Sequence, residues 1–304
     1  MASELAHIWT LDPGVTFLNH GGYGATPRPV LAAQQRWRDQ MEAEPVRFFA
    51  HDLEPALDEA RHALGPFVGA DPEDLVFVPN ATAGINTVLR SLRFAAGDEL
   101  LTTDHAYAAA RNAMEFVAER EGARVVVAPV PFPLQSPREV IDAVMRCVTP
   151  HTRLAVVDHV SSPTALVFPI EELVGELTLR GVEVLVDGAH APGQLALSVP
   201  SLGASYYAAN LHKWVCAPKG AGFLWVRRDR QPLIRPLAIS NGAASTRTNR
   251  SRFRLDFDWT GTADPSAWLA VPDAIEFGAQ LMPGGWQTLI ERNHRLLLEA
   301  RDLL

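Results

Sequence analysis

Residues 183–226 read EVLVDGAHAPGQLALSVPSLGASYYAANLHKWVCAPKGAGFLWV and contain three short β-rich runs, at residues 183–187, 205–209 and 222–226. Each run is apolar or aromatic and is bounded by glycine, proline or asparagine, which is typical of a strand. Apolar strands without clear in-out alternation indicate a sheet that helices cover on both faces. The stretch therefore predicts three strands of a buried sheet.

Four similar runs precede this stretch and are separated by helical patterns: LVFVP, ELLTT, RVVVA and LAVVD at residues 75–79, 99–103, 124–128 and 154–158. Strands that alternate with helices favour a doubly wound sheet. We predict an α/β fold with a mostly parallel seven-stranded sheet and helices on both faces. Ligands of such sheets bind at the carboxyl ends of the strands.

The segments outside the sheet suggest the domain organisation. Helical spacing covers residues 28–63, a polar, turn-rich stretch covers 229–265, and helical patterns return at 266–281 and 286–304. We expect an N-terminal arm at 1–27, a large α/β domain at 28–265 and the start of a C-terminal helical region at 266–304. The final LLLEARDLL lacks a Gly or Pro stop, which predicts that the rest of a small C-terminal domain is absent.

The composition limits the classes of partner that the protein is expected to bind. A formal net charge of -8 disfavours nucleic acid and anionic membranes, so a small-molecule substrate is expected. The N-terminus lacks a signal peptide pattern and no apolar run is long enough for a membrane helix, which predicts a cytoplasmic protein. Cys147 and Cys216 lack the spacing of a disulfide framework or a zinc site, so no metal is expected.

Lysine usage points to chemistry. The 27 basic residues include only two lysines, Lys213 and Lys219. Arginine can replace lysine on a solvated surface but cannot act as a nucleophilic amine, so a retained lysine suggests a reaction that needs one. Lys213 follows a predicted strand in NLHKWVCAPKG, whereas Lys219 lies in a Pro-Lys-Gly turn that suits a structural or surface role.

An acidic residue and a histidine follow the neighbouring strand. In VLVDGAHAPG, Asp187 ends a buried run and His190 comes three residues later; Asp158 ends another strand in the same way. Taken alone, Asp187 and His190 could be metal ligands of a hydrolase, or Asp187 could cap a turn. Beside Lys213 they fit pyridoxal 5'-phosphate (PLP), whose pyridine nitrogen needs a carboxylate and whose aldehyde needs a lysine amine.

Two further segments follow predicted strands. NATAGINTVLRSL begins a helix with free backbone N–H groups before Thr82, which suits a phosphate, although an ordinary N-cap has the same pattern. In DHAYAAARN, Tyr107 and His105 could stack on a cofactor ring or move a proton, or could be ordinary packed side chains.

The order of these segments resembles the class V aminotransferase family of fold-type I PLP enzymes, and within it the isopenicillin N epimerase-like branch. The resemblance runs from about residue 15 to the end. It is carried by LNHGGYGATP, NATAGINTVLRSL, DHVSSPTALVFPIEEL, VLVDGAHAPG and NLHKWVCAPKGAGFLWVR. It implies the aspartate aminotransferase-like fold of PLP-dependent transferases.

The resemblance also implies residue roles. Lys213 would form the Schiff base, Asp187 would contact the pyridine nitrogen, and His190 would lie near the ring oxygen. Tyr107 would stack on the ring. The implied cofactor-binding residues are Thr82, Ala83, Tyr107, Ser162, Asp187, His190, Asn210, His212, Lys213 and, from the second subunit of a homodimer, Thr262. Asn19 and Arg47 are candidate substrate contacts, because the family's carboxylate-binding arginine lies beyond residue 304.

The expected reaction starts from an amino acid bound to PLP as an external aldimine, followed by a Cα carbanion. An isopenicillin N epimerase-like epimerase or a carbon–sulfur lyase is the first prediction, with Lys213 and Tyr107 moving protons. A class V aminotransferase is the alternative. A desulfurase is disfavoured because no cysteine falls in a flexible catalytic loop. A metal-dependent hydrolase using Asp187, His190 and His212, or an inactive PLP-fold protein, are the remaining alternatives.

Overall fold

The seven predicted strands form one sheet. The computed structural model describes residues 5–303, and its strands are β1 (Leu75–Val78), β2 (Glu99–Thr103), β3 (Arg124–Ala128), β4 (Thr152–Asp158), β5 (Glu183–Asp187), β6 (Tyr206–Asn210) and β7 (Gly222–Val226). Their order in the sheet is β1-β7-β6-β5-β4-β2-β3. Strand β7 runs antiparallel to both neighbours, and the other pairs are parallel. The predicted mostly parallel sheet is confirmed, with strand ends shifted by one or two residues.

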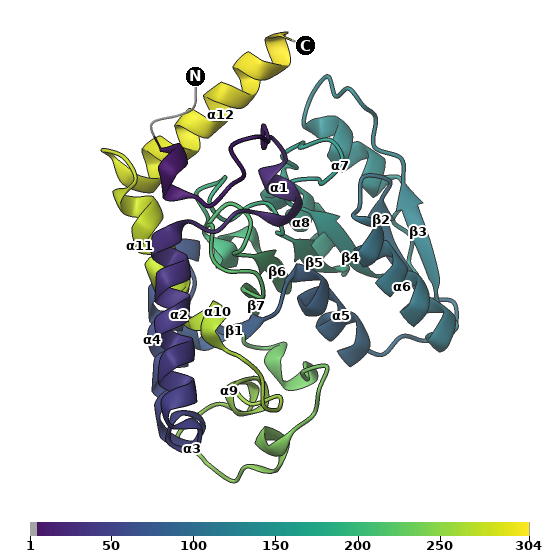
Figure 1. The fold of residues 1–304 in the computed structure, drawn as a ribbon. Helices are drawn as coiled ribbons and strands as arrows, with labels where there is room; N and C mark the ends of the chain where they lie inside the picture. The colour runs from purple at the N-terminus through teal and green to yellow at the C-terminus, as the bar shows by residue number, and fades with distance from the viewer. Residues whose placement is uncertain (1–4, 304) are drawn as a thin grey trace.

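Helices cover both faces of this sheet (Figure 1). One face packs against α5 (Ala81–Ser91), α6 (Ala108–Glu121) and α9 (Arg252–Phe257). The other packs against α4 (Leu53–Val68), α7 (Arg138–Met145) and α8 (Ile170–Leu179). Successive side chains of β1 enter opposite cores, with Phe77 on the α4 side and Val76 on the α5 side. This explains why the strands are apolar without alternation.

The helical stretch expected at 28–63 is divided into several helices. Helix α2 (Arg28–Ala43) ends before Glu44, and the short helices α3 (Pro45–Arg47) and η2 (Phe48–Asp52, π-helical) lead into α4. Glu44 adopts φ -153° and ψ 80°, because a residue before proline is pushed out of the helical region. Helix α4 then continues to Val68, where Gly69 ends it in a left-handed conformation at φ 65°.

The C-terminal helices pack on the N-terminal ones. Helices α10 (Ser266–Leu269) and α11 (Val271–Gln280) lie against α2 and α4, and α12 (Gly285–Leu303) follows (Figure 1). Leu269, Val271 and Ala274 belong to the same core as the α4 face of the sheet. The boundary at residue 265 therefore crosses a shared core, and the division into domains stays a prediction.

The remaining short helices are η1 (Ala6–Ile8), α1 (His20–Tyr23), η3 (Pro72–Asp74), η4 (Val199–Leu202), η5 (Gln231–Leu233) and η6 (Asn241–Ala244). Within the described residues no helix is long and apolar enough to cross a membrane. The stretch 229–265, expected as irregular, contains η5, η6 and the buried α9. Ser251 caps α9 by accepting a hydrogen bond from the Arg254 backbone N–H at 3.2 Å.

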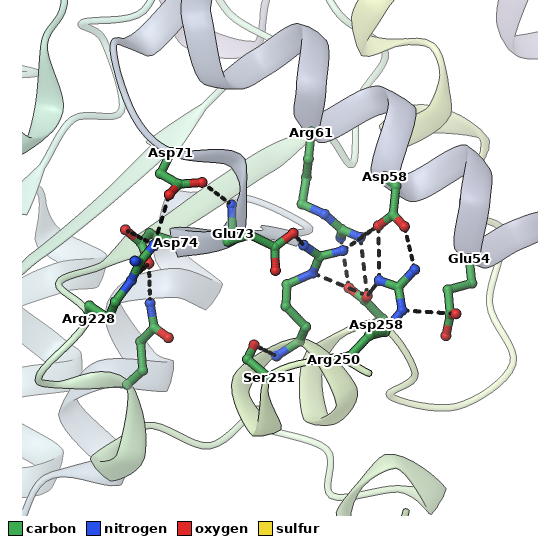
Figure 2. A network of polar contacts seen from close by, with 12 residues as sticks. Glu54, Asp58, Arg61, Asp71, Glu73, Asp74, Arg228, Arg250, Ser251 and Asp258 are labelled. Atoms are coloured by element: carbon green, nitrogen blue, oxygen red, sulfur yellow. Dashed lines mark hydrogen bonds and ion pairs between the residues drawn. The ribbon is translucent and has the colours of Figure 1, made fainter. Parts of the chain in front are cut away.

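A buried ionic network joins α4 to α9 and the loop that follows it (Figure 2). Arg61 and Arg254 are each 1 % exposed, and both bind the carboxylates of Asp58 and Asp258. Arg250 also contacts both carboxylates. Burial opposes ionisation of Asp58, but hydrogen bonds from Arg250 and Arg61 lower its pKa well below the usual range. Paired, hydrogen-bonded charges of this kind hold the two segments in one arrangement.

Candidate active site

The carboxyl ends of β4, β5 and β6, the N-terminus of α5 and the N-terminal arm enclose one cavity of about 170 Å³. Its lining brings together residues that lie far apart in the sequence. These are Gly22, Tyr23, Asn80, Ala81, Thr82, Tyr107, Asp158, Ser162, Asp187, Ala189, His190, Asn210, His212 and Lys213. The position agrees with the rule that ligands of parallel sheets bind at the carboxyl edge.

Lys213 lies between β6 and β7 and contacts His190. The Lys213 Nζ atom is 2.9 Å from His190 Nε2, and Trp214 Nε1 donates to His190 Nδ1 at 3.4 Å. An indole N–H can only donate, so the proton of a neutral His190 is on Nε2 and points to the amine. Burial, with help from the charge of Lys213, lowers the pKa of His190 to about 4. A neutral His190 that donates its Nε2 proton to the amine favours a neutral, nucleophilic Lys213.

Burial also lowers the pKa of Lys213, and the negative charge of Asp187 opposes this shift. An amine with a lowered pKa is unprotonated in a larger fraction of molecules at neutral pH, which is the form that can attack a carbonyl carbon. The other lysine, Lys219, lies in the Pro-Lys-Gly turn and does not line this cavity.

Asp187 ends β5 and is 5 % exposed. The Ala189 backbone N–H donates to Asp187 Oδ1 at 3.0 Å, and no described residue donates to Oδ2 through a hydrogen bond. Burial raises the pKa of Asp187, against the effects of the Ala189 N–H and Lys213. The turn after it requires glycine, because a Cβ at Gly188 would come within 2.4 Å of the Tyr207 ring. Oδ2 is thus left for a positively charged partner in the cavity.

Helix α5 presents one free N–H to the cavity. Its first N–H, of Ala81, donates to Asn210 Oδ1 at 2.8 Å, and the third, of Ala83, donates to the cap Asn80 Oδ1 at 2.9 Å. Within residues 5–303, neither the N–H nor the hydroxyl of Thr82 has a hydrogen-bond partner. Both groups can therefore donate to an anion, with the helix dipole in its favour.

Other lining side chains offer further contacts. The Nδ1 of His212 lies 3.1 Å from the Ala221 carbonyl, so Nδ1 donates and Nε2 remains for a ligand. Burial lowers the pKa of His212, so its Nε2 atom is unprotonated in the absence of a bound anion. A bound anion would favour protonation of Nε2, which could then donate a hydrogen bond to it. Tyr107 is half exposed at the start of α6, and Ser162 lies in the loop after β4.

The N-terminal arm closes the cavity in a way that the sequence analysis did not anticipate. His20 Nε2 donates to the Lys213 carbonyl at 2.9 Å. Gly24, at φ 74°, leaves no room for a side chain, since a Cβ would lie 1.8 Å from the His212 carbonyl oxygen. The glycines of LNHGGYG were the available signal, because closely spaced glycines mark close backbone approach.

Several predicted residues do not line this cavity. Ala83 uses its N–H in the helix cap, and Asn19 lies behind the lining, with its side chain against Gly22. Arg47 is exposed on α3 and pairs with Asp52 at 3.4 Å, at the end of α2 away from the site (Figure 1). Thr262 lies in the exposed loop after α9. His105 is buried and contacts Thr164 Oγ1 and the Val130 carbonyl.

Comparison with known proteins identifies the family. The sequence model of aminotransferase class-V matches residues 16–301. The chain belongs to the class V aminotransferase family. Class V enzymes use PLP, and the predicted recognition, fold and cofactor are thereby confirmed. This chain is a PLP-dependent class V enzyme.

Its relatives catalyse more than one kind of reaction. The chain is 41% identical to the isopenicillin N epimerase of Amycolatopsis lactamdurans, over 97% of this chain and 76% of the relative. It is 33% identical to putative L-cysteine desulfhydrase 1 of Oryza sativa subsp. japonica, over 96% and 63%. The solved cystine C–S lyase C-DES, in complex with cysteine persulfide, aligns with a TM-score of 0.78 at 26% identity, over 91% and 75%.

The cavity fits PLP by the chemistry of its free groups. A positive ring nitrogen suits Asp187 Oδ2, a phosphate suits the Thr82 N–H and hydroxyl, and an aldehyde suits the Lys213 amine. In contrast, the described part of the chain holds no group of three or more His, Cys, Asp or Glu residues that could bind a metal ion.

Proposed function

We propose that this class V enzyme acts on an amino acid as an epimerase or a carbon–sulfur lyase, with Lys213 as the residue that binds PLP covalently. The observation that carries the proposal is the arrangement of the Lys213 amine, His190 and Asp187 around one cavity, with Nζ 2.9 Å from His190 Nε2. When bound, PLP delocalises the electron pair that remains after a bond at Cα is broken.

The residues around the cavity have distinct roles in this proposal. Asp187 keeps the ring nitrogen protonated, and Thr82 and His212 hold the phosphate. Asn210 supports the phosphate site indirectly, because it fixes the Ala81 N–H. Tyr107 and Ser162 border the ring. With PLP bound, the Lys213 amine would take the Cα proton of the substrate, and His190 would hold its Nε2 proton against that amine.

The fate of the Cα electron pair distinguishes the two reactions. Proton return to the opposite face of Cα gives the epimer, and Tyr107 is the candidate acid. Loss of a sulfur group from Cβ gives the lyase products. The sequence similarity to isopenicillin N epimerase and to L-cysteine desulfhydrase supports both outcomes. Amino transfer remains the alternative reaction of the family.

A desulfurase reaction needs a reactive thiolate near the substrate. Burial raises the pKa of Cys216 to about 12, and its Sγ is directed at His20 and the Trp214 carbonyl. Cys147 follows α7, and neither cysteine lines the cavity. Within the part of the chain that the structure describes, no cysteine is therefore placed to accept sulfur.

The experiment follows the Cα hydrogen in D₂O. We expect PLP-loaded enzyme to exchange the Cα proton of isopenicillin N or L-cystine, as measured by loss of its NMR signal. Formation of the D-configured product identifies the epimerase, whereas pyruvate with released sulfur identifies the lyase. An enzyme that consumes a 2-oxo acid to form a new amino acid, without either product, would instead be an aminotransferase.

We also propose a homodimer in which Thr262 reaches the partner subunit's phosphate site. Mixing Lys213→Ala with Thr262→Ala protein tests this, because a hybrid dimer would hold one site with both residues intact. After subunit exchange we expect recovery of about a quarter of wild-type activity, since half of the dimers are hybrids with one intact site each. Lack of recovery in a mixture that does exchange subunits would mean that Thr262 does not act across the interface.

A further inference from the structure

A second carboxyl group lies beside Asp187. Strands β4 and β5 are parallel neighbours, and Asp158 pairs with Asp187 in the register of the sheet. Paired residues of adjacent strands are roughly 5 Å apart at their backbones, with side chains on the same face. Asp158 and Asp187 are 3 % and 5 % exposed, and both line the cavity. Two carboxyl groups therefore share one small, buried space.

The surroundings of the two carboxyl groups differ. Asp187 accepts the Ala189 N–H at 3.0 Å, and this hydrogen bond stabilises its anion. Asp158 accepts no hydrogen bond from any other residue in the range 5–303, and the charge that acts on it is that of Asp187. The proton of the pair therefore belongs on Asp158, because Asp187 accepts a hydrogen bond from another residue, the Ala189 N–H, whereas Asp158 interacts only with its own backbone N–H.

The other titratable groups around the pair do not change this assignment. They are Tyr23, Tyr107, His190, His212 and Lys213 in the cavity, and the adjacent buried His159 and Tyr207. His159 Nδ1 is 2.9 Å from the Tyr207 hydroxyl, and burial lowers its pKa to about 4, so it is neutral. Burial and then the charge of Asp187 raise the pKa of Asp158 well above its usual value.

We propose that Asp158 is a positioning residue that keeps its proton, so that the pair carries one negative charge, on Asp187, and one carboxyl hydrogen, on Asp158. The role deepens the proposed function and rests on it, since the pair would contact bound PLP. A single charge matches a single protonated ring nitrogen, whereas two charges would leave one carboxylate unpaired in a buried site. The Asp158 hydroxyl donates a hydrogen bond that holds Asp187, or an oxygen of the cofactor, in place.

The first test uses the protein without cofactor, so that it does not depend on PLP chemistry. A raised folded-state pKa gives stability that is fully present below the unfolded pKa of about 3.9 and is lost as pH rises through the folded-state value. Asp158→Asn removes this loss. We expect the melting temperature of the variant to rise relative to wild type as the pH increases above the unfolded-state pKa. A difference that stays constant with pH overturns the proposal.

The second test measures PLP affinity by titration of the cofactor-free protein. We expect Asp158→Ala to weaken binding roughly 10- to 100-fold, the loss of a hydrogen bond to a charged group. Asp158→Asn should restore most of the affinity, because its amide also donates without charge. Asp187→Asn is the matched control. It should bind PLP more weakly than wild type does, since Asp187 is needed as an anion.

The outcomes separate this proposal from the proposed function. If Asp158→Asn binds PLP as weakly as Asp158→Ala, Asp158 is needed as an anion and the inference is wrong. If wild-type protein binds no PLP, the proposed function fails, and the pH dependence of the cofactor-free protein still decides whether Asp158 keeps its proton.

Discussion

Replacing Lys213 with alanine is expected to abolish the covalent link to PLP and to reduce turnover by at least about 10²- to 10⁴-fold, the usual contribution of a positioned acid or base. The physical reason is that the Lys213 amine borders the cavity, where burial lowers its pKa and its Nζ contacts His190. The measurement is borohydride reduction of the PLP-loaded protein, followed by peptide mapping of the pyridoxyl label.

Lys219 provides a matched control, because it is the other lysine of the chain. It lies only six residues away, in a turn that does not line the cavity. Lys219→Ala should therefore keep both the label on Lys213 and most of the activity. A label that survives in Lys213→Ala but disappears in Lys219→Ala would place the covalent link at Lys219 and refute the assignment.

Replacing Arg61 with methionine is expected to lower the free energy of unfolding by roughly 3 kcal/mol, near the lower end of the cost of breaking a buried ion pair. Methionine keeps much of the side-chain volume but leaves Asp58 and Asp258 without one partner (Figure 2). The cost is at the lower end because Arg250 and Arg254 still contact both carboxylates. Urea denaturation of the cofactor-free protein measures it.

Arg36→Met is the control for this prediction. Arg36 pairs with Asp273 at 3.2 Å, but its side chain is 69% exposed, and exposed pairs contribute little to stability. Wild type should also lose more stability than Arg61→Met as pH falls from neutral, because carboxylates with lowered pKa values stabilise the fold only while they are ionised. Equal denaturation midpoints for Arg61→Met and Arg36→Met would show that the network does not stabilise the fold.

Much of the fold could be predicted because its local signals agree with the tertiary structure. The runs at 99–103, 124–128, 183–187 and 222–226 match strands residue for residue. The apolar composition of these runs reflects their burial between two helical layers, so the local sequence agrees with the tertiary environment. The helix at 28–63 was less predictable, because Pro45 interrupts a pattern whose apolar spacing continues on both sides.

Parts of the candidate site could be predicted from the sequence, because PLP chemistry requires particular residue types and they occur at or after the ends of predicted strands. Lys213, Asp187, His190 and Thr82 follow strands and meet in one cavity. The site roles themselves stay predictions for the experiments above. The sequence did not predict the local contacts of Ala83 and Arg47: within this chain Ala83 uses its N–H for the helix cap, and Arg47 lies on α3.

The sequence by itself determined the α/β class and the PLP cofactor, and it predicted Lys213 as the residue that binds PLP, because strand composition and a nucleophilic amine are properties of single short segments. Only the tertiary structure decided which groups share a low-dielectric space. It placed Asp158 beside Asp187, gathered Arg61, Arg250 and Arg254 around two carboxylates, and brought His20 onto the Lys213 backbone. Such proximities depend on sheet register and helix packing between distant segments, and electrostatic effects follow distance and burial in space.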